Sequence, residues 1–404
     1  MQKTVAVLCG GGPAPGINTV IASCAKVFIR NGYRVLGVHN GFKGLLTEPN
    51  EIEEITAKQA DYLFETGGSY LRMSRFKPAD SDFNTNFFDT YKPELLITIG
   101  GDDTASTANR LSRFLQSKNY KVSNIHVPKT IDNDLPLPPG VPTFGFRSAV
   151  EEGTKIAKTI YNDARTSGNW FIVTAMGREA GHLAFEIGAS ARYSQIIIPE
   201  MFAGKITLQK IARLAISSML KRTAAGTDFG AVMISEGVFH FIDKEEIANS
   251  GARFSTDSHG HPELHSISKS HLFIAIIAKE MAKTALKTRT RAVEIGFSLR
   301  TVAPCAFDLK YCSVLGQGVY ELFAKGKTGC MVSLSETGNI IPIFVEKISD
   351  AKGKVKPRLV DITAPEITMF YTYAAEYTTA ADYGLVAHLT QTPEYFDFEK
   401  ILSE

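Results

Sequence analysis

The sequence predicts an α/β protein built from two doubly wound, mainly parallel sheets. Short apolar runs rich in β-branched residues alternate with segments of helical periodicity over most of the chain, which is the pattern of strand–helix–strand units. The 404 residues are enough for two domains, and four prolines within Leu135–Pro142 mark a stiff connector and a candidate boundary. Glycine- or proline-rich turns follow several predicted strands. They lie at the carboxyl ends of the strands, which is where such sheets bind their ligands.

The composition is that of a globular protein without a large charge imbalance. Lys and Arg number 44 against 42 Asp and Glu, which gives a net charge of +2, and 44% of the residues are hydrophobic. Without a basic excess, nucleic acid is not an expected partner. No apolar run reaches the length of a membrane span, and the run that begins at Thr4 is too short for a signal peptide, so we expect no membrane partner.

The five cysteines indicate neither a disulfide framework nor a zinc site. Their number is odd, their spacing is irregular and no C-x-x-C pair occurs. We therefore expect reduced thiols and a cytoplasmic location. The cysteines are Cys9, Cys24, Cys305, Cys312 and Cys330.

The first predicted unit is a strand, a glycine turn and a helix. Thr4–Cys9 is an apolar run, Gly10–Asn18 follows it, and apolar residues then recur at helical spacing from Ile17 to Phe28. In such a unit the backbone N–H groups of the turn and the amino terminus of the helix attract anions. The motif is not a complete phosphate-binding fingerprint, so an ordinary tight turn is the alternative.

Two later turns carry acidic residues at the ends of predicted strands. Asp102 and Asp103 follow one strand, and Lys129, Asp132 and Asp134 follow the next. Carboxylates can hold Mg²⁺, a lysine can neutralise phosphate, and one carboxylate can accept a proton. Either stretch alone could be a solvated turn, but together they predict a magnesium–phosphate site. The strands and the helix assigned in this part are Tyr33–His39, Glu94–Ile99, Ile125–Val127 and Thr104–Ser117.

A second alternating series predicts the second sheet. Its strands are expected at Trp170–Ala175, Ile196–Pro199 and Phe229–Ser235, and its helices at Phe144–Arg165, Ala180–Ala191, Leu208–Lys221 and Leu272–Leu286. A helix at Phe307–Gly316 and a strand at Gly329–Ser335 follow. Three histidines within His259–His265 could suggest a metal site, but Gly and Pro make a loop the preferred interpretation. The aromatic run Met369–Tyr377 predicts helix packing or a subunit contact.

Several of these segments resemble the signature segments of the phosphofructokinase family, specifically its diphosphate-dependent branch. The resemblance rests first on Gly100-Gly-Asp-Asp-Thr104 and Pro128-Lys-Thr-Ile-Asp-Asn-Asp134, and it extends in ordered blocks over about residues 1–335. It implies two Rossmann-like domains with the active site in the cleft between them. Residues 1–143 plus about 300–345 would form the phosphoryl-donor domain. Residues 144–299 plus part of the C-terminal segment would form the sugar-phosphate domain, with 346–404 an extension of uncertain assignment.

The resemblance implies a reversible, Mg²⁺-dependent transfer of a phosphoryl group from inorganic diphosphate to the 1-hydroxyl of fructose 6-phosphate, in glycolysis or gluconeogenesis. Asp132 would accept the hydroxyl proton, Asp134 would support it, and Asp102 would hold the metal. The donor contacts implied by the family are Gly11, Arg75, Gly101 and Thr104. A homodimer or homotetramer with active sites shared between subunits is also implied.

Asp103 and Lys129 decide the donor in this comparison. ATP-dependent relatives usually carry glycine at both positions, which leaves room for the α-phosphate of ATP. Asp103 places a negative side chain there and so opposes ATP by bulk and repulsion. Lys129 can supply positive charge to the leaving phosphate. An ATP-dependent sugar-phosphate kinase is the alternative.

The sugar-phosphate side is implied by matches in both halves of the chain. The implied contacts are Thr130, Ile131, Asp132, Met176, Gly177, Arg178, Glu236, Arg291, Phe297 and Arg300, with Arg291 supplied by a neighbouring subunit. Phe297 replaces a histidine or tyrosine, and Asn169 replaces an arginine that short bacterial members use for the 6-phosphate. Arg147, Arg165 or Arg289 could compensate, or the acceptor could be another sugar phosphate such as sedoheptulose 7-phosphate. A rival hypothesis is a non-catalytic regulatory subunit that binds a sugar phosphate. It is opposed by the presence of the residues implied in catalysis, namely Asp102, Lys129, Asp132 and Asp134.

Overall fold

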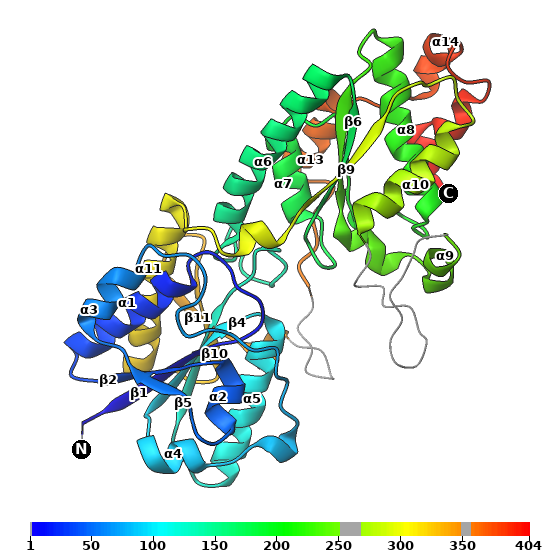
Figure 1. Ribbon diagram of the computed structural model, residues 1–404. Coiled ribbons are helices and arrows are strands. Elements are labelled where there is room, and N and C mark those ends of the chain that lie inside the picture. The colour runs from blue at the N-terminus through cyan, green and yellow to red at the C-terminus, as the bar shows by residue number, and fades with distance from the viewer. Residues whose placement is uncertain (1, 251–267, 349–356) are drawn as a thin grey trace. The chain divides into compact units, whose positions relative to one another are not determined.

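The computed structural model describes residues 2–250, 268–348 and 357–404, which form two compact units (Figure 1). Unit 1 comprises Met1–Ala149 and Phe297–Arg358, and unit 2 comprises Val150–Gly296 and Leu359–Glu404. The first boundary falls inside helix α6 (Phe146–Ser167), so the chain passes between the units three times. The histidine-containing segment His259–His265 lies outside the described residues.

Unit 1 contains, among its described residues, a seven-stranded sheet in the order β11-β10-β5-β4-β1-β2-β3. The strands are β1 (Thr4–Cys9), β2 (Arg34–Val38), β3 (Ile52–Glu54), β4 (Leu95–Gly100), β5 (Ser123–Pro128), β10 (Cys330–Leu334) and β11 (Ile340–Phe344). The helices are α1 (Ile17–Arg30), α2 (Gly41–Leu46), α3 (Ala57–Leu63), α4 (Asn86–Tyr91), α5 (Asp102–Ser117), α11 (Ala306–Ala324) and α12 (Val345–Ile348). The strands run parallel except β3 and β11, which pair antiparallel at the two edges.

Helices cover both faces of this sheet, and β1 shows how the sequence encodes that arrangement (Figure 1). Val5, Val7 and Cys9 belong to the core shared with α1 and α11, whereas Ala6 and Leu8 belong to the core shared with α2, α4 and α5. Alternate side chains of a strand point to opposite faces. A strand covered on both faces is therefore apolar throughout, as β1 is.

The strand order places a topological switch point between β1 and β4. The chain leaves β1 towards β2 on one side, and β4 pairs with β1 on the other side. Cys9 pairs with Ile99 and Gly100 pairs with Pro128, so β1, β4 and β5 end at one edge of the sheet. Open α/β sheets bind ligands beyond the carboxyl ends of strands at such a point.

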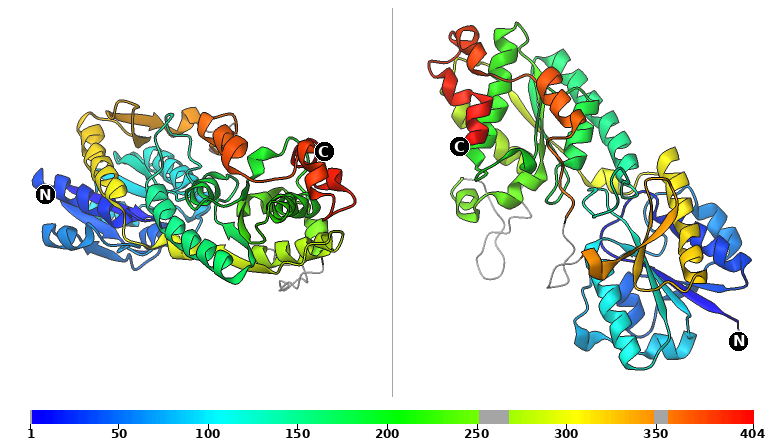
Figure 2. Two further views of the ribbon diagram at one scale, coloured as in Figure 1. Left: turned by 90° about the horizontal axis from the view of Figure 1, so that it is seen from above. Right: turned by 180° about the vertical axis from the view of Figure 1, so that it is seen from behind.

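Unit 2 contains, within the described ranges, a four-stranded parallel sheet in the order β7-β8-β6-β9. The strands are β6 (Trp170–Ala175), β7 (Gln195–Ile197), β8 (Gly230–Ser235) and β9 (Thr290–Ile295). The helices are α7 (His182–Ser190), α8 (Leu208–Ala224), α9 (Lys244–Ala248), α10 (Lys269–Met281), α13 (Pro365–Met369), α14 (Tyr383–Val386) and α15 (Phe398–Ser403). Helices α6 and α7 lie on one face, and α8 and α10 lie on the other (Figures 1 and 2).

The prediction of an α/β fold with two mainly parallel sheets is confirmed. The sequence did not predict the edge strands β3 and β11, nor β9, and α10 ends at Met281 rather than at Leu286. The aromatic run near the C-terminus packs on unit 2, with Phe370 5.4 Å from Phe185 and Tyr377 stacked 3.9 Å from Phe398, between ring centroids. Among the residues that the structure describes, no helix is long and apolar enough to cross a membrane.

Candidate active site

The glycine turn after β1 is held in contact with Lys129. The amine of Lys129 donates a hydrogen bond to the carbonyl oxygen of Gly12, at 2.5 Å. Gly11 has a positive φ of 80°, and a Cβ atom at this position would lie 3.7 Å from the same amine. The left-handed backbone is therefore what favours glycine here, since a Cβ atom would be in ordinary van der Waals contact with Lys129.

Asp102 and Asp103 occupy the first turn of α5, and Gly101 caps the helix. Carboxylates at a helix amino terminus are stabilised by the helix dipole. Thr104 is buried behind them, and a Cβ atom at Gly10 or Gly100 would come within 2.5 or 2.4 Å of its hydroxyl oxygen. Thr104, a predicted donor contact, thus packs beneath both glycine turns and fixes their spacing.

Lys129 is buried at the carboxyl end of β5. Its side chain is 6% exposed, and its backbone N–H donates to the carbonyl of Gly100 at 2.8 Å. Burial lowers the pKa of the Lys129 amine to about 8; Asp132 opposes this shift and Arg300 adds to it. The amine therefore carries its charge at neutral pH but is ready to bind an anion, because water solvates it poorly.

The turn that carries Asp132 is rigidly built. The backbone N–H of Asp132 donates to the Thr130 hydroxyl at 3.0 Å, and Thr143 donates to the Thr130 carbonyl at 2.7 Å. Asn133 has a positive φ of 58°, and Arg358 donates to its carbonyl at 3.1 Å. Ile131 and Asp134 are buried, while Asp132 is half-buried. Arg358 was not predicted from the sequence.

Buried His126 ties β5 to the end of β4 in the same region. Its Nε2 lies 2.9 Å from the Gly100 carbonyl and its Nδ1 lies 2.9 Å from the Thr98 hydroxyl. Burial lowers the pKa of His126 to about 4, so the ring is neutral at pH 7. A neutral ring that donates to Gly100 and accepts from Thr98 satisfies both contacts.

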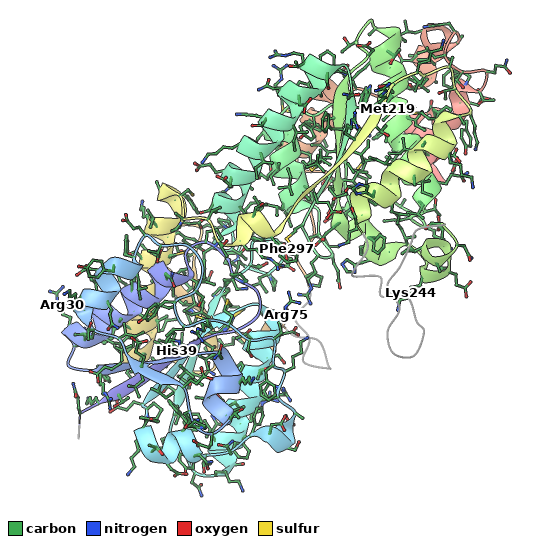
Figure 3. The ribbon with its side chains drawn as sticks, viewed as in Figure 1. Arg30, His39, Arg75, Met219, Lys244 and Phe297 are labelled. Atoms are coloured by element: carbon green, nitrogen blue, oxygen red, sulfur yellow. The ribbon has the colours of Figure 1, made fainter. Side chains whose placement is uncertain are left out.

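Arg75 and Lys77 belong to a segment that crosses this edge. Arg75 is exposed at the surface of unit 1 (Figure 3). The amine of Lys77 lies 2.7 Å from a carboxylate oxygen of Asp103. Lys77 was missed because its partner is distant in sequence and no local pattern marks the pair.

Arg300 and Phe297, which the resemblance implied as sugar contacts, lie in unit 1. A Cβ atom at Gly12 would lie 3.5 Å from the guanidinium carbon of Arg300, so this arginine adjoins the glycine turn. The same carbon lies 5.0 Å from the centre of the Phe297 ring, which is 73% exposed (Figure 3). Arg300 therefore adds a positive charge to the group around Lys129.

A second group of predicted residues meets at the carboxyl edge of the sheet in unit 2. The carboxylate of Glu236 accepts hydrogen bonds from the backbone N–H groups of Gly177 and Arg178, at 3.3 and 3.4 Å. Its other oxygen pairs with the amine of Lys269 at 2.9 Å. The backbone of Met176 donates to the Ile295 carbonyl at 3.1 Å. Lys269 is an addition that sequence patterns did not indicate.

Arg291 is not part of that group within one chain. It pairs with Phe171 near the amino end of the sheet, while Ile295 pairs with Ala175 at the carboxyl end. Four residues of strand separate the two positions by about 13 Å. Arg291 is exposed on an edge strand. Asn169 lies at the same amino edge, beside Arg289 in a pocket of about 470 Å³.

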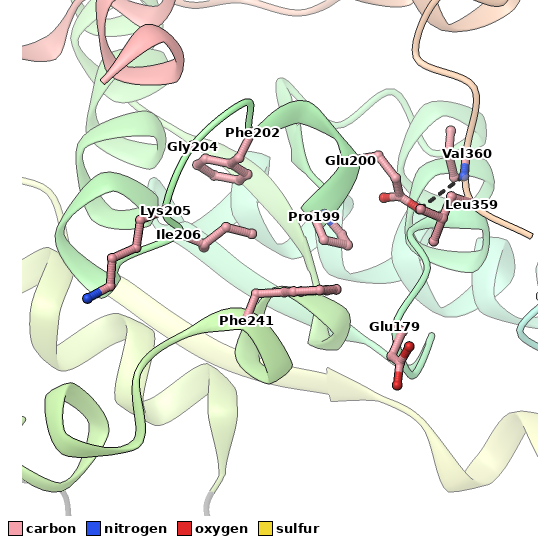
Figure 4. A pocket seen from close by; sticks show the side chains of 10 residues that line it. All are labelled: Glu179, Pro199, Glu200, Phe202, Gly204, Lys205, Ile206, Phe241, Leu359 and Val360. Carbon is pink, nitrogen blue, oxygen red and sulfur yellow. Dashed lines mark hydrogen bonds between the residues drawn. The ribbon is translucent and has the colours of Figure 1, made fainter. Parts of the chain in front are cut away.

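Another pocket, of about 560 Å³, adjoins the loop that carries Met176 and Arg178 (Figure 4). Glu200 on its wall accepts hydrogen bonds from the backbone N–H groups of Gly181, at 2.9 Å, and Val360, at 3.0 Å. Burial raises the pKa of the Glu200 carboxyl. Glu200 thus joins the start of α7 to the C-terminal segment.

Within residues 2–250, 268–348 and 357–404, no cluster of three or more His, Cys, Asp or Glu side chains is placed to hold a metal ion. Mg²⁺ commonly takes only one or two carboxylates and completes its shell with substrate phosphates and water. Asp102, half-buried at the start of α5, fits that limited role.

Comparison with known proteins identifies the relatives of the chain. The family model described as phosphofructokinase matches residues 4–323. A pyrophosphate–fructose 6-phosphate 1-phosphotransferase from Thermotoga maritima is 36% identical, over 91% of this chain and 89% of the relative. One of the same name from Naegleria fowleri is 34% identical, over 89% of this chain and 85% of the relative. The crystal structure of a pyrophosphate-dependent phosphofructokinase from Nitrosospira multiformis superposes with a TM-score of 0.70 at 17% identity, covering 96% of this chain and 92% of that one.

Proposed function

The chain belongs to the phosphofructokinase family, and from this premise we propose that it is a diphosphate-dependent 6-phosphofructokinase. It transfers a phosphoryl group reversibly from inorganic diphosphate to the 1-hydroxyl of fructose 6-phosphate, with Mg²⁺ as the metal. The products are fructose 1,6-bisphosphate and phosphate. Two relatives, each at least 34% identical over most of both chains, carry names with this donor and this acceptor.

The position of Asp103 is the observation that most strongly supports diphosphate as the donor. Asp103 stands in the first turn of α5, next to Thr104, which packs against Gly10 of the glycine turn. A carboxylate at this position occupies space and repels a further phosphate, which opposes ATP but not the shorter diphosphate. Lys129 is buried beside the turn and can stabilise charge that develops on the leaving phosphate.

Unit 1 carries the donor groups and the base in this proposal. Asp132 accepts the proton of the sugar hydroxyl, and buried Asp134 maintains the negative potential of the turn. The side chains proposed to bind the donor phosphates are Arg75 and Lys129, while Arg300, proposed to bind the sugar phosphate, adjoins the same glycine turn. Asp102 would hold Mg²⁺, which would supply positive charge to offset that of the donor phosphates.

Unit 2 carries the sugar-phosphate contacts. The Glu236 carboxylate, fixed by Lys269 and by two backbone N–H groups, can accept a hydrogen bond from a sugar hydroxyl. Arg178 and Met176 lie on the same loop. Since Arg291 stands about 13 Å along β9 from this edge, we propose that it serves the site of a neighbouring subunit in a homodimer or homotetramer.

We also place the protein in the cytoplasm. The support is that the cysteines are free thiols, four of them buried, a state typical of a reducing compartment.

The direct test compares phosphorylation of fructose 6-phosphate with diphosphate and with ATP, each with Mg²⁺. We expect turnover with diphosphate and at least a hundredfold lower kcat/KM with ATP. Turnover with ATP alone would reverse the donor assignment. Inactivity with both donors would favour a regulatory sugar-phosphate-binding subunit. Assaying sedoheptulose 7-phosphate in parallel tests the acceptor assignment.

A further inference from the structure

Lys77 forms an ion pair with Asp103, the residue to which the donor choice is assigned. The amine of Lys77 lies 2.7 Å from the carboxylate, and the side chains are 71% and 58% exposed. Exposed pairs of this kind contribute only about 0–1 kcal/mol to stability. The stability of unit 1 therefore gives little reason for Lys77 to be placed here.

The position of Lys77 is built by contacts on both sides of it. Before it, Ser74 forms a parallel β-bridge with Gly10 of the glycine turn. After it, Arg110 donates a hydrogen bond to the Pro78 carbonyl at 2.7 Å and pairs with Asp80 at 2.5 Å. The segment from residue 74 to residue 80 is thus fixed to the glycine turn at one end and to α5 at the other.

Arg110 and Asp103 are seven residues apart on α5, so they lie on the same face of the helix, about two turns from each other. The segment from residue 74 to residue 80 passes over this face of α5. Its Lys77 contacts Asp103, and its Pro78 and Asp80 contact Arg110. The Lys77–Asp103 contact is therefore one end of a two-point attachment.

We propose that Lys77 is a positioning residue for donor specificity, acting through Asp103; this inference rests on the proposed function. The pair fixes the Asp103 carboxylate where its bulk opposes ATP, and Lys77 offsets part of its negative charge so that the shorter diphosphate can bind beside it. Without Lys77, the carboxylate of Asp103 in the first turn of α5 would face a polyanionic donor without this compensating charge. Repulsion would then weaken diphosphate binding.

A double-mutant cycle tests this. We expect Lys77→Ala to lower kcat/KM for diphosphate about fivefold, mainly through KM, and Lys77→Arg to restore most of the loss. In the Asp103→Gly background, the same Lys77→Ala change should alter kcat/KM for diphosphate less than about twofold. Lys26→Ala, which breaks another exposed ion pair of unit 1 with Asp61, is the matched control and should change neither value.

Equal losses from Lys77→Ala in both backgrounds would overturn the proposal, because Lys77 would then act independently of Asp103. The absence of any loss in the wild-type background would overturn it as well. If the wild-type enzyme fails to use diphosphate at all, the proposed function fails first, and that result is seen before any variant is made.

Discussion

The buried charge of Lys129 leads to a quantitative prediction about pH. Its pKa of about 8, against 10.5 for an exposed lysine, means that the charge is lost within an accessible range. The protonated fraction falls from about nine-tenths at pH 7 to about one-tenth at pH 9. If the ammonium form binds the donor, kcat/KM for diphosphate falls about tenfold over this interval.

The matched control is Lys129→Met, which keeps the length of the side chain and removes its charge. Diphosphate also titrates in this range, but its titration is common to both enzymes. The ratio of wild-type to variant kcat/KM should therefore decline with an apparent pKa near 8. A ratio that stays constant from pH 7 to pH 9.5 would refute the assignment of a charged, donor-binding Lys129.

The same pKa predicts a cost in stability. The unfolded chain binds more protons than the folded one between pH 8 and pH 10.5, so stability rises with pH in that window and the cost is complete below it. The difference corresponds to ~3 kcal/mol. Lys129→Met should therefore raise the opening free energy of β4 and β5 amides at pH 7, as measured by hydrogen exchange. A lowered opening free energy would contradict this.

Three further predictions concern other parts of the molecule. Asp132→Ala should lower kcat at least a thousandfold while fructose 6-phosphate binding, followed by calorimetry, changes less than threefold; equal turnover would exclude Asp132 as the base. Burial lowers the pKa of His126 to about 4 in the folded protein, so the folded state loses stability as pH falls from 6.5 towards 4. From pH 7 to pH 5 the wild type should lose about 2 kcal/mol more opening free energy than His126→Gln. Equal losses in the two proteins would contradict this. A randomly reassociated 1:1 mixture of Asp132→Ala and Arg291→Ala chains should regain about a quarter of wild-type activity if Arg291 acts between the subunits of a dimer, and none if it acts within its own chain.

The sequence was sufficient for what depends on local pattern. The apolar run of β1, the glycine turn after it and the acidic start of α5 were predicted because each has its periodicity or turn chemistry within a few residues. The three-residue strand β3 is too short to show such a pattern. The position of β11 at the sheet edge depends on its pairing with β10. Register and edge position are tertiary properties, so neither strand was predicted.

The supporting residues of the candidate site were unpredictable for a related reason. Arg358 contacts Asn133 across 225 positions, and Lys269 contacts Glu236 across 33. An arginine or lysine with a distant partner looks like any other surface charge in the sequence. Only the fold shows that it fixes a turn or a carboxylate.

The charges at the carboxyl edge of unit 1 give a physical reason for the Mg²⁺ dependence that we propose. The cations there are Arg75, Lys77, Lys129, Arg300 and Arg358, and the carboxylates are Asp102, Asp103, Asp132 and Asp134. Five positive and four negative side chains leave a formal charge of only +1, so the edge offers little net attraction to free diphosphate. In the function that we propose, binding the diphosphate together with Mg²⁺ would reduce the charge that must be neutralised and would give Asp102 a favourable partner. The carboxylates proposed to oppose ATP and to accept the proton would then make Mg²⁺ necessary for diphosphate binding as well as for phosphoryl transfer.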